Sequence, residues 1–463
     1  MGNKLDTPHH ASSTSPSSPQ ASAKNFTGSF RPGFSPRSSP ASSPTNDTKG
    51  GVSSRTPKKP MALSPTTMSI ASGAGRTGAA ATVVSPAVLL RSLDSEGESP
   101  RGEEEGVDCE VTDILRRYSH VGGRAVSIKD FDLLKVLGKG SFGKVMLVRF
   151  KGSRELYAMK TLRKEALIRR SQLAHTSTER YILQHIHHPF LMRLSYAFQT
   201  KQKLYMVVDY MAGGELFFWL KKGKFGQTRA KLYAAEILCA LEALHKHNVV
   251  YRDLKPENIL LDADGHIRLT DFGLCKANVT GYGVDGGAHT FCGTPEYLAP
   301  EVLENKGHGK GIDWWSLGTL LYEMICGLPP FYDQNVQKMY KKIMTAPLNP
   351  SKLLSEDAKA IIQGLLERKV VHRLGCGPAG AAEIKNHPFF AGLDWDKVTN
   401  RKYQPEFVPP RARRRSVDVD NFDKEFTQEV CQDSVVQTIL TAQQEEMANF
   451  EGFTYDPRGA RLR

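Results

Sequence analysis

The chain of 463 residues carries 62 lysines and arginines against 49 aspartates and glutamates, a formal net charge of +13. Nucleic-acid binders often carry such an excess, but here the basic residues are spread along the chain apart from the cluster 411–415. No zinc-finger spacing or aromatic-studded basic strand occurs, which argues against direct nucleic-acid binding. The cysteines form no CxxC pair, which argues against a zinc site and a disulfide framework and indicates a reducing compartment.

No run approaches the roughly 20 apolar residues that cross a bilayer, and the N-terminus has no signal-peptide core. The chain opens with Met1-Gly2, but the myristoylation pattern requires Ser or Thr at the position that Asp6 occupies. We therefore expect a protein of the cytoplasm or the nucleus without stable membrane insertion.

Composition divides the chain into three parts. Residues 1–123 are rich in Ser, Pro, Thr, Ala and Gly with almost no aromatics, which predicts a disordered region. Its Ser-Pro pairs fit either phosphorylation by proline-directed kinases or a plain linker. Residues 131–390 alternate apolar runs with helix-forming segments and can bury a sizeable core. Residues 391–463 are irregular and polar but carry aromatic clusters, which predicts a tail that packs against another part of the protein.

Within the central part, the elements follow a recognisable order. Residues 131–160 contain three apolar, β-rich runs and predict strands. Residues 171–186 have helical spacing, residues 204–210 read as a buried strand, and residues 228–248 predict a long amphipathic helix. Because the rest is mainly helical to about residue 390, we expect an α+β fold with a small β-rich part and a larger helical part.

A glycine-rich run lies between the first two predicted strands, with Gly138, Gly140 and Gly143 in the spacing G-x-G-x-x-G. Its glycines permit a tight hairpin whose backbone amides can approach the phosphates of a nucleotide. Dinucleotide-binding folds share this spacing but need a helix directly after it, whereas residues 144–150 read as a strand. The context therefore excludes the dinucleotide interpretation.

Lys160 ends the third predicted strand, where its ammonium group can reach the α- and β-phosphates of ATP. Glu179 lies on the following predicted helix and is the candidate partner of this lysine. An ordinary surface glutamate on an amphipathic helix is the alternative interpretation.

The segment 251–258, YRDLKPEN, is the most specific motif of the chain. Asp253 can accept a hydrogen bond from a substrate hydroxyl, Lys255 can neutralise a transferring phosphoryl group, and Asn258 offers an amide oxygen to Mg²⁺. Asp271, in Asp-Phe-Gly, offers a carboxylate to the same metal. Together these motifs predict phosphoryl transfer with ATP and Mg²⁺.

Several further residues are expected to have a structural role around these motifs. Glu301, in Ala-Pro-Glu, is expected to form a buried ion pair with Arg373. Asp313 is expected to accept hydrogen bonds from the backbone of the segment 251–258. A pseudokinase that keeps the fold without the chemistry is the competing interpretation, but no phosphate-binding, metal-binding or base residue is missing.

From Phe131 to Tyr455 the chain resembles AGC-group serine/threonine protein kinases of the Akt, SGK and ribosomal-protein kinase subgroup. The resemblance rests on Tyr251 in place of the usual histidine, on the segment 289–301 (HTFCGTPEYLAPE), and on the tail motif 450–455 (FEGFTY). It implies a bilobal protein kinase fold, with the αC helix in a β-rich N-lobe, a helical C-lobe and an AGC C-terminal tail. No segment resembles a PH or C1 domain.

The resemblance also implies roles for individual residues. Asp253 and Lys255 would be catalytic, and Asn258 and Asp271 would bind the metal. Glu215 would meet a substrate arginine three residues before the acceptor, and Glu257 and Glu323 a more N-terminal arginine. The residues implied to bind ATP are Leu137, Gly138, Lys139, Gly140, Ser141, Phe142, Gly143, Lys144, Val145, Lys160, Glu179, Asp209 and Met211.

Regulation by phosphorylation follows from the same resemblance. An upstream kinase of the phosphoinositide-dependent type would phosphorylate Thr290, order the glycine-rich segment before it, and place the phosphate among His175, Arg252 and Lys276. A hydrophobic-motif kinase would phosphorylate Thr454, whose phosphate Gln199 would receive. Thr294 would be a structural hydroxyl near Asp253.

Two further serines of the tail are candidate phosphorylation sites. Ser434 lies near the turn-motif site of the group but lacks the following proline. Ser416 follows arginines at positions five and three before it, the pattern expected of this enzyme's own substrates, so self-phosphorylation is one interpretation. A solvated basic linker or a nuclear-import patch is the other. We expect a monomer that acts on protein substrates with basic motifs.

Overall fold

The computed structural model describes residues 126–349, 351–410, 417–436 and 440–457. The predicted disordered region 1–123 and the candidate site Ser416 lie outside these residues.

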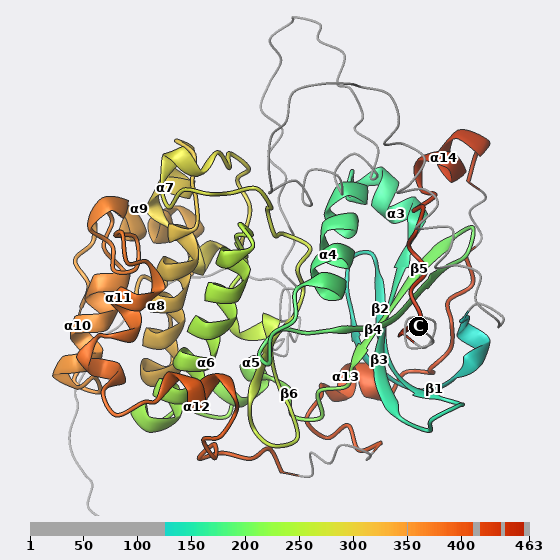
Figure 1. Cartoon of the computed structure of the whole chain (residues 1–463), viewed down its shortest axis with the longest axis horizontal. Helices are drawn as coiled ribbons and strands as arrows, with labels where there is room; N and C mark the ends of the chain where they lie inside the picture. Colours follow the sequence, from blue (N-terminus) through green and yellow to red (C-terminus); the bar gives the residue numbers. More distant parts are fainter. Residues whose placement is uncertain (1–125, 350, 411–416, 437–439, 458–463) are drawn as a thin grey trace, which may run out of the picture. The chain divides into compact units, whose positions relative to one another are not determined.

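The small lobe is built on a five-stranded antiparallel sheet in the order β1-β2-β3-β5-β4. The helices α3 and α4 follow β3 and lie on one side of this sheet (Figure 1). The sequence predicted β1, β2, β3 and β5 from their apolar, β-rich runs, but did not predict β4. The bounds are β1 Phe131–Lys139, β2 Gly143–Phe150, β3 Leu156–Arg163, α3 Lys164–Arg169, α4 Leu173–His185, β4 Leu194–Gln199 and β5 Lys203–Asp209.

The large lobe is mainly helical and includes a three-stranded sheet in the order β6-β7-β8 that the sequence analysis did not predict. Each of these strands has two or three residues, too short for a clear periodic signal. The bounds are β6 Gly214–Glu215, α5 Leu216–Leu220, α6 Gln227–Lys246, β7 Ile259–Leu261, β8 Ile267–Leu269, α7 Pro300–Leu303, α8 Gly311–Cys326, α9 Val336–Thr345, α10 Glu356–Leu365, α11 Ala381–Lys385 and α12 Trp395–Thr399.

The core of the large lobe forms around α8, which packs against α6 and α10 (Figure 1). Nearly every side chain of α8 is buried, including Trp314 and Trp315, because the helix is apolar on all sides. By contrast α10 is amphipathic and begins at Ser355, whose hydroxyl accepts a hydrogen bond of 3.2 Å from the Ala358 amide. Because α8 is buried between α6 and α10, it gives the large lobe a rigid centre against which the neighbouring loops can pack.

The chain after α12 returns from the large lobe to the small lobe. The short helix α13, Lys424–Thr427, lies against β1, and α14, Ala442–Met447, lies near α3 (Figure 1). The Phe422 ring stacks on Tyr210 with 5.9 Å between ring centroids. At the end of the tail, Tyr455 forms an antiparallel bridge with Ala197 of β4. The tail aromatics therefore find their packing partners on the same chain.

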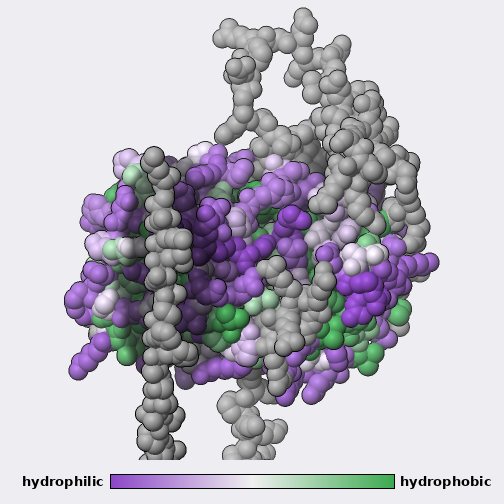
Figure 2. All heavy atoms as spheres, turned by 60° about the horizontal axis from the view of Figure 1, so that its bottom comes forward, coloured by the Kyte–Doolittle hydropathy of each residue, from purple (hydrophilic) through white to green (hydrophobic). Residues whose placement is uncertain are grey.

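Hydrophilic residues dominate the face shown in Figure 2, with smaller hydrophobic areas between them. Among the helices of the described ranges, none combines the length and the apolar character that a membrane span requires.

Candidate active site

The structure brings Lys160 of β3 and Glu179 of α4 together between the sheet and the helix. The Lys160 Nζ donates a hydrogen bond of 2.6 Å to the Glu179 Oε1 and lies 3.4 Å from the Asp271 Oδ1. Burial lowers the pKa of Lys160, but the carboxylates of Asp271 and Glu179 outweigh it and raise the pKa well above its usual range. The ammonium group is therefore charged at neutral pH.

The candidate catalytic segment is a compact network around Asp253. Its Oδ2 lies 2.8 Å from the Lys255 Nζ and accepts a bond of 2.8 Å from the Asn258 Nδ2. The Thr294 hydroxyl donates to the Asp253 Oδ1 at 3.0 Å and accepts from the Lys255 Nζ at 2.9 Å. Burial raises the pKa of Asp253, and the neighbouring Lys255 opposes this shift. The network holds the carboxylate in one orientation.

Asp313 of α8 holds this segment from beneath. Its Oδ1 accepts from the Arg252 amide at 2.9 Å, and its Oδ2 accepts from the Tyr251 amide at 2.9 Å and contacts the His245 Nε2 at 2.8 Å. Arg252 has a φ of 68°, an uncommon conformation that these bonds stabilise. The Tyr251 hydroxyl donates to the Thr270 carbonyl and so ties the segment to the one that precedes Asp271.

Asp271 and Asn258 offer the oxygens that a magnesium ion prefers. The Asp271 side chain is half exposed at the cleft, and the Asn258 amide nitrogen is engaged by Asp253, which leaves its oxygen as the available ligand atom. Mg²⁺ is commonly held by one or two protein oxygens together with substrate phosphates. In the described ranges no cluster of three His, Cys, Asp or Glu residues could hold a metal alone. The donor set therefore fits a metal that arrives with a nucleotide.

The glycine-rich hairpin joins β1 to β2. The absence of a side chain has a different effect at Gly143 than at Gly138 and Gly140. A Cβ at Gly143 would lie 1.7 Å from the Thr161 carbonyl oxygen, so packing against β3 requires glycine there. A Cβ at Gly138 or Gly140 would meet nothing within 4 Å, which leaves open space beside the backbone. Such space suits close approach of a phosphate group.

Two further residues implied to bind ATP lie where β5 leaves the small lobe. Asp209 ends β5, and Met211 follows it in the connection between the lobes. The Met211 side chain is buried, and its carbonyl accepts from the Gly214 amide at 3.2 Å. These contacts fix the backbone that would border an adenine ring.

Comparison with known proteins agrees with this geometry. Residues 131–390 match the protein kinase domain, and residues 416–455 match the protein kinase C terminal domain. The chain belongs to the protein kinase family. The predicted bilobal kinase fold is thereby confirmed, and the C-terminal domain identifies an AGC-group serine/threonine protein kinase.

The relatives of this kinase are similar over the kinase domain and the tail. Protein kinase 2 of Dictyostelium discoideum is 54% identical over 328 residues, which are 70% of this chain and 67% of the relative. Serine/threonine-protein kinase YPK1 of Saccharomyces cerevisiae is 51% identical over 339 residues, 73% of this chain and 48% of the relative. RAC-beta serine/threonine-protein kinase A of Xenopus laevis is 50% identical over 308 residues, 66% and 62% of the two chains. The matched part thus spans about half of the yeast relative.

The three glutamates implied to bind substrate arginines come from three elements of this kinase: Glu215 from β6, Glu257 from the turn before β7, and Glu323 from α8. Burial raises the pKa of Glu215 to about 7, and Glu257 adds repulsion. Burial also raises the pKa of Glu323 to about 7, although the Tyr297 hydroxyl donates to its Oε2. The charge of Glu257 raises the pKa of both Glu215 and Glu323, so the three carboxylates lie near one another, and a bound cation would relieve their repulsion.

The Ala-Pro-Glu segment of the kinase is fixed by the ion pair that the sequence predicted. The Glu301 Oε1 and Oε2 lie 2.7 and 2.9 Å from the Arg373 Nη1 and Nη2. Both side chains are buried, so the pair is a structural element of the large lobe.

His175 of α4 lies near two cationic side chains, Arg252 and Lys276. Burial lowers the pKa of His175, and the charges of Arg252 and Lys276 lower it further. The Arg252 Nη1 is buried without a hydrogen-bond partner among the described residues. Thr290 itself is exposed. An unpaired buried guanidinium nitrogen lacks a hydrogen-bond acceptor, which an anionic partner could supply.

The C-terminal hydrophobic motif occupies a site beside α4 and β4. Phe450 and Phe453 are each 3% exposed. The Gln199 Nε2 donates to the Phe450 carbonyl at 2.7 Å, and the Arg180 Nε donates to the Phe453 carbonyl at 3.2 Å. Arg180 also lies over the Phe453 ring at 5.7 Å. Thr454 is exposed.

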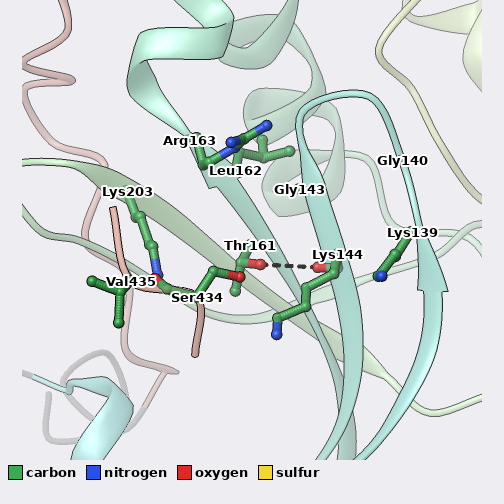
Figure 3. A pocket seen from close by; sticks show the side chains of 10 residues that line it. All are labelled: Lys139, Gly140, Gly143, Lys144, Thr161, Leu162, Arg163, Lys203, Ser434 and Val435. Atoms are coloured by element: carbon green, nitrogen blue, oxygen red, sulfur yellow. Dashed lines mark hydrogen bonds between the residues drawn. The ribbon is translucent and has the colours of Figure 1, made fainter. Parts of the chain in front are cut away.

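Sequence reasoning missed Arg180 because a charged residue beside Glu179 on a helix looks like an ordinary solvent-facing position. It also missed a small pocket between the β2-β3 edge and the tail (Figure 3). Figure 3 shows Ser434 and Lys203 close together at this pocket. Its lining residues are Lys139, Gly140, Gly143, Lys144, Thr161, Leu162, Arg163, Lys203, Ser434 and Val435.

Proposed function

We propose that this kinase transfers the γ-phosphoryl group of ATP to serine and threonine hydroxyls of proteins that carry arginine before the acceptor. The observation that carries the proposal is the fixed Asp253 carboxylate, with Lys255 and Thr294 on its oxygens, within one molecule that also carries the acidic site of Glu215 and Glu323. The first part supplies phosphoryl-transfer chemistry and the second supplies affinity for basic substrates.

In this mechanism Asp253 accepts a hydrogen bond from the substrate hydroxyl and orients its oxygen for in-line attack on the γ-phosphorus. The P–O bond to the new ester forms as the bond to the ADP oxygen breaks, and the hydroxyl proton passes to the Asp253 carboxylate. Lys255 lies beside Asp253 and neutralises charge on the transferring group. Thr294 bonds to both side chains and so holds them in a fixed relative position.

The small lobe would hold the nucleotide. Lys160, oriented by Glu179, binds the α- and β-phosphates, and the hairpin 138–143 covers them. Asp271 and Asn258 would hold Mg²⁺, which neutralises the charge of the β- and γ-phosphates when bound. The residues 137 and 144–145, together with Asp209 and Met211, would line the rest of the nucleotide site.

Regulation would use the two phosphorylation sites that the resemblance implies. A phosphate on Thr290 would bind His175, Arg252 and Lys276, which is supported by the unpaired Arg252 Nη1. A phosphate on Thr454 would strengthen a tail that is already docked, because Arg180 and Gln199 lie beside the neighbouring carbonyls. An activation-loop kinase and a hydrophobic-motif kinase would be the upstream partners.

The tail carries two further candidate sites. The cationic pocket beside Ser434 in Figure 3 favours a phosphate there. Ser416 remains a candidate for self-phosphorylation between molecules. We further propose a monomer that acts in the cytoplasm or the nucleus and does not bind nucleic acid.

A direct test measures transfer of labelled γ-phosphate to a peptide with arginines five and three residues before a serine. The wild-type protein should label the peptide, and Asp271→Ala should abolish labelling. Replacing the arginine three residues before the acceptor by alanine should raise KM. Equal labelling by wild type and Asp271→Ala would refute the proposed chemistry, and an unchanged KM would refute the substrate preference alone.

A further inference from the structure

The activation segment of this kinase contains a glycine-rich stretch, residues 281–288, that lies against a second glycine-rich stretch, residues 307–311, at the start of α8. From the sequence, the first stretch looked like a mobile loop that a phosphate would order. In the structure the two stretches are paired through their backbones.

Four hydrogen bonds join the two stretches. The amides of Ala288 and His308 each donate to the carbonyl of the other, at 3.2 and 2.8 Å. The Lys310 amide donates to the Gly281 carbonyl at 2.9 Å, and the Gly311 amide donates to the Tyr282 carbonyl at 3.0 Å. Ala288 and His308 are almost fully buried. This pairing satisfies amides at the start of α8 that the helix itself cannot satisfy.

The close approach depends on glycine on both sides. A Cβ at Gly309 would lie 2.2 Å from the Gly281 carbonyl oxygen, and a Cβ at Gly286 would lie 2.4 Å from the Gly309 Cα. Neither glycine has a positive φ, so the absence of a side chain is needed for packing and not for backbone conformation. Since the atoms that would clash belong to the backbone, an alanine could enter only by separating the two stretches.

The remaining part of the segment is short. Upstream, the Lys276 and Val250 amides each donate to the carbonyl of the other, at 3.0 and 2.9 Å. Downstream, Thr294 bonds to Asp253 and Lys255. Between Ala288 and Thr294 only residues 289–293, which include Thr290, lack these anchors.

We infer that the first half of the activation segment is a permanently docked segment, held by glycine-to-glycine contact with residues 307–311, and that phosphorylation of Thr290 orders only residues 289–293. The docking stands independently, whereas the statement about phosphorylation rests on the proposed function. The docking fixes the chain at Ala288, two residues before Thr290, before any phosphate is present. It thereby reduces the chain length that a phosphate must immobilise.

Hydrogen exchange on the full chain carrying Thr290→Ala tests the docking without any contribution from phosphate. The four donor amides, those of Ala288, His308, Lys310 and Gly311, should exchange at least about 100-fold more slowly than in an unstructured peptide. Exchange at the rate of an unstructured peptide would overturn the inference. Full activity of Thr290→Ala after treatment with the upstream kinase, with these amides still protected, would refute the proposed regulation and leave the docking intact.

The contribution of glycine is tested by Gly309→Ala, with Gly283→Ala as the matched control. A Cβ at Gly283 would find its nearest neighbour, the Asp285 Oδ1, at 3.4 Å, an ordinary contact. Gly309→Ala should speed hydrogen exchange of the four donor amides at least about tenfold, whereas Gly283→Ala should speed it less than about threefold. Protection of the β2-β3 amides shows that each variant folds. Equal exchange in the two variants would overturn the role of the glycine contact.

Discussion

Lys203 and Asp433 form an ion pair, with 2.6 Å between Nζ and Oδ1, that joins the start of β5 to the C-terminal tail. The Tyr205 hydroxyl donates to the other carboxylate oxygen, Oδ2, at 2.9 Å, and Lys203 also donates to the Ser434 carbonyl. The Lys203 side chain is buried, so it depends on these tail groups for its hydrogen bonds. The tail is therefore anchored beside Ser434 without a phosphate.

Replacing Asp433 by asparagine should destabilise the protein by about 1–3 kcal/mol, because it leaves a buried ammonium group without its counter-charge. The measurement is urea unfolding followed by tyrosine and tryptophan fluorescence. Glu429→Gln is the matched control, since its partner Lys139 is half exposed, whereas Lys203 is buried, and the exposed pair should be worth less than about 1 kcal/mol. Equal stability of the two variants would show that Asp433 does not anchor the tail.

Thr294→Ala should lower kcat by roughly 10- to 100-fold, because Asp253 and Lys255 lose the hydroxyl that bonds to both. Steady-state kinetics with a basic peptide measure this change. Thr294→Ser keeps the hydroxyl and should retain most of the activity, and KM for ATP should stay near that of the wild type. A kcat of Thr294→Ala equal to that of the wild type would contradict a positioning role.

Affinity for arginine-containing substrates should rise with pH across the neutral range. A glutamate attracts a guanidinium group only when ionised, and the pKa values of Glu215 and Glu323 are both raised to about 7. Protonation at pH 6 therefore weakens binding, and ionisation at pH 8 restores it. We expect KM for the basic peptide to fall by up to about tenfold from pH 6 to pH 8.

The control for this pH dependence is a peptide in which alanine replaces the arginines. Its KM should be higher throughout and should change little with pH. Glu323→Gln should flatten the profile of the arginine peptide. If KM for both peptides followed pH in the same way, the effect would have to come from groups outside the acidic site.

The double substitution Phe450→Ala, Phe453→Ala should undock the end of the tail. Two buried phenylalanines contribute roughly 3–6 kcal/mol, and ordering each tail residue costs about 1–2 kcal/mol. The net free energy of docking is therefore small, and losing both rings should reverse its sign. We expect lower heat stability, lower activity, and faster hydrogen exchange over residues 448–455. Phe291→Ala changes a phenylalanine that is half exposed and should leave the tail docked. Unchanged exchange in the double variant would contradict the contribution of these rings.

Some features of this protein follow from the sequence because they are local. The glycine-rich hairpin, the segment 251–258 and the Asp-Phe-Gly segment each place their groups within a few residues, so their types and spacing predict the chemistry. The predicted pairs of Lys160 with Glu179 and of Glu301 with Arg373 are present at short distances. Asp313 accepts backbone hydrogen bonds as expected. The two aromatic residues of the tail motif indicated a buried site, and both are buried.

Only the tertiary structure decided which distant residues meet. Arg180 bonds to Phe453 across 273 positions, and Lys203 bonds to Asp433 across 230. Neither contact leaves a periodic trace in the sequence, because a long connection can close on many surfaces and its final position depends on packing. The contact between Gly286 and Gly309 could likewise not be predicted from the sequence. In the sequence they indicate flexibility, whereas in the fold the absence of their side chains lets two backbones touch.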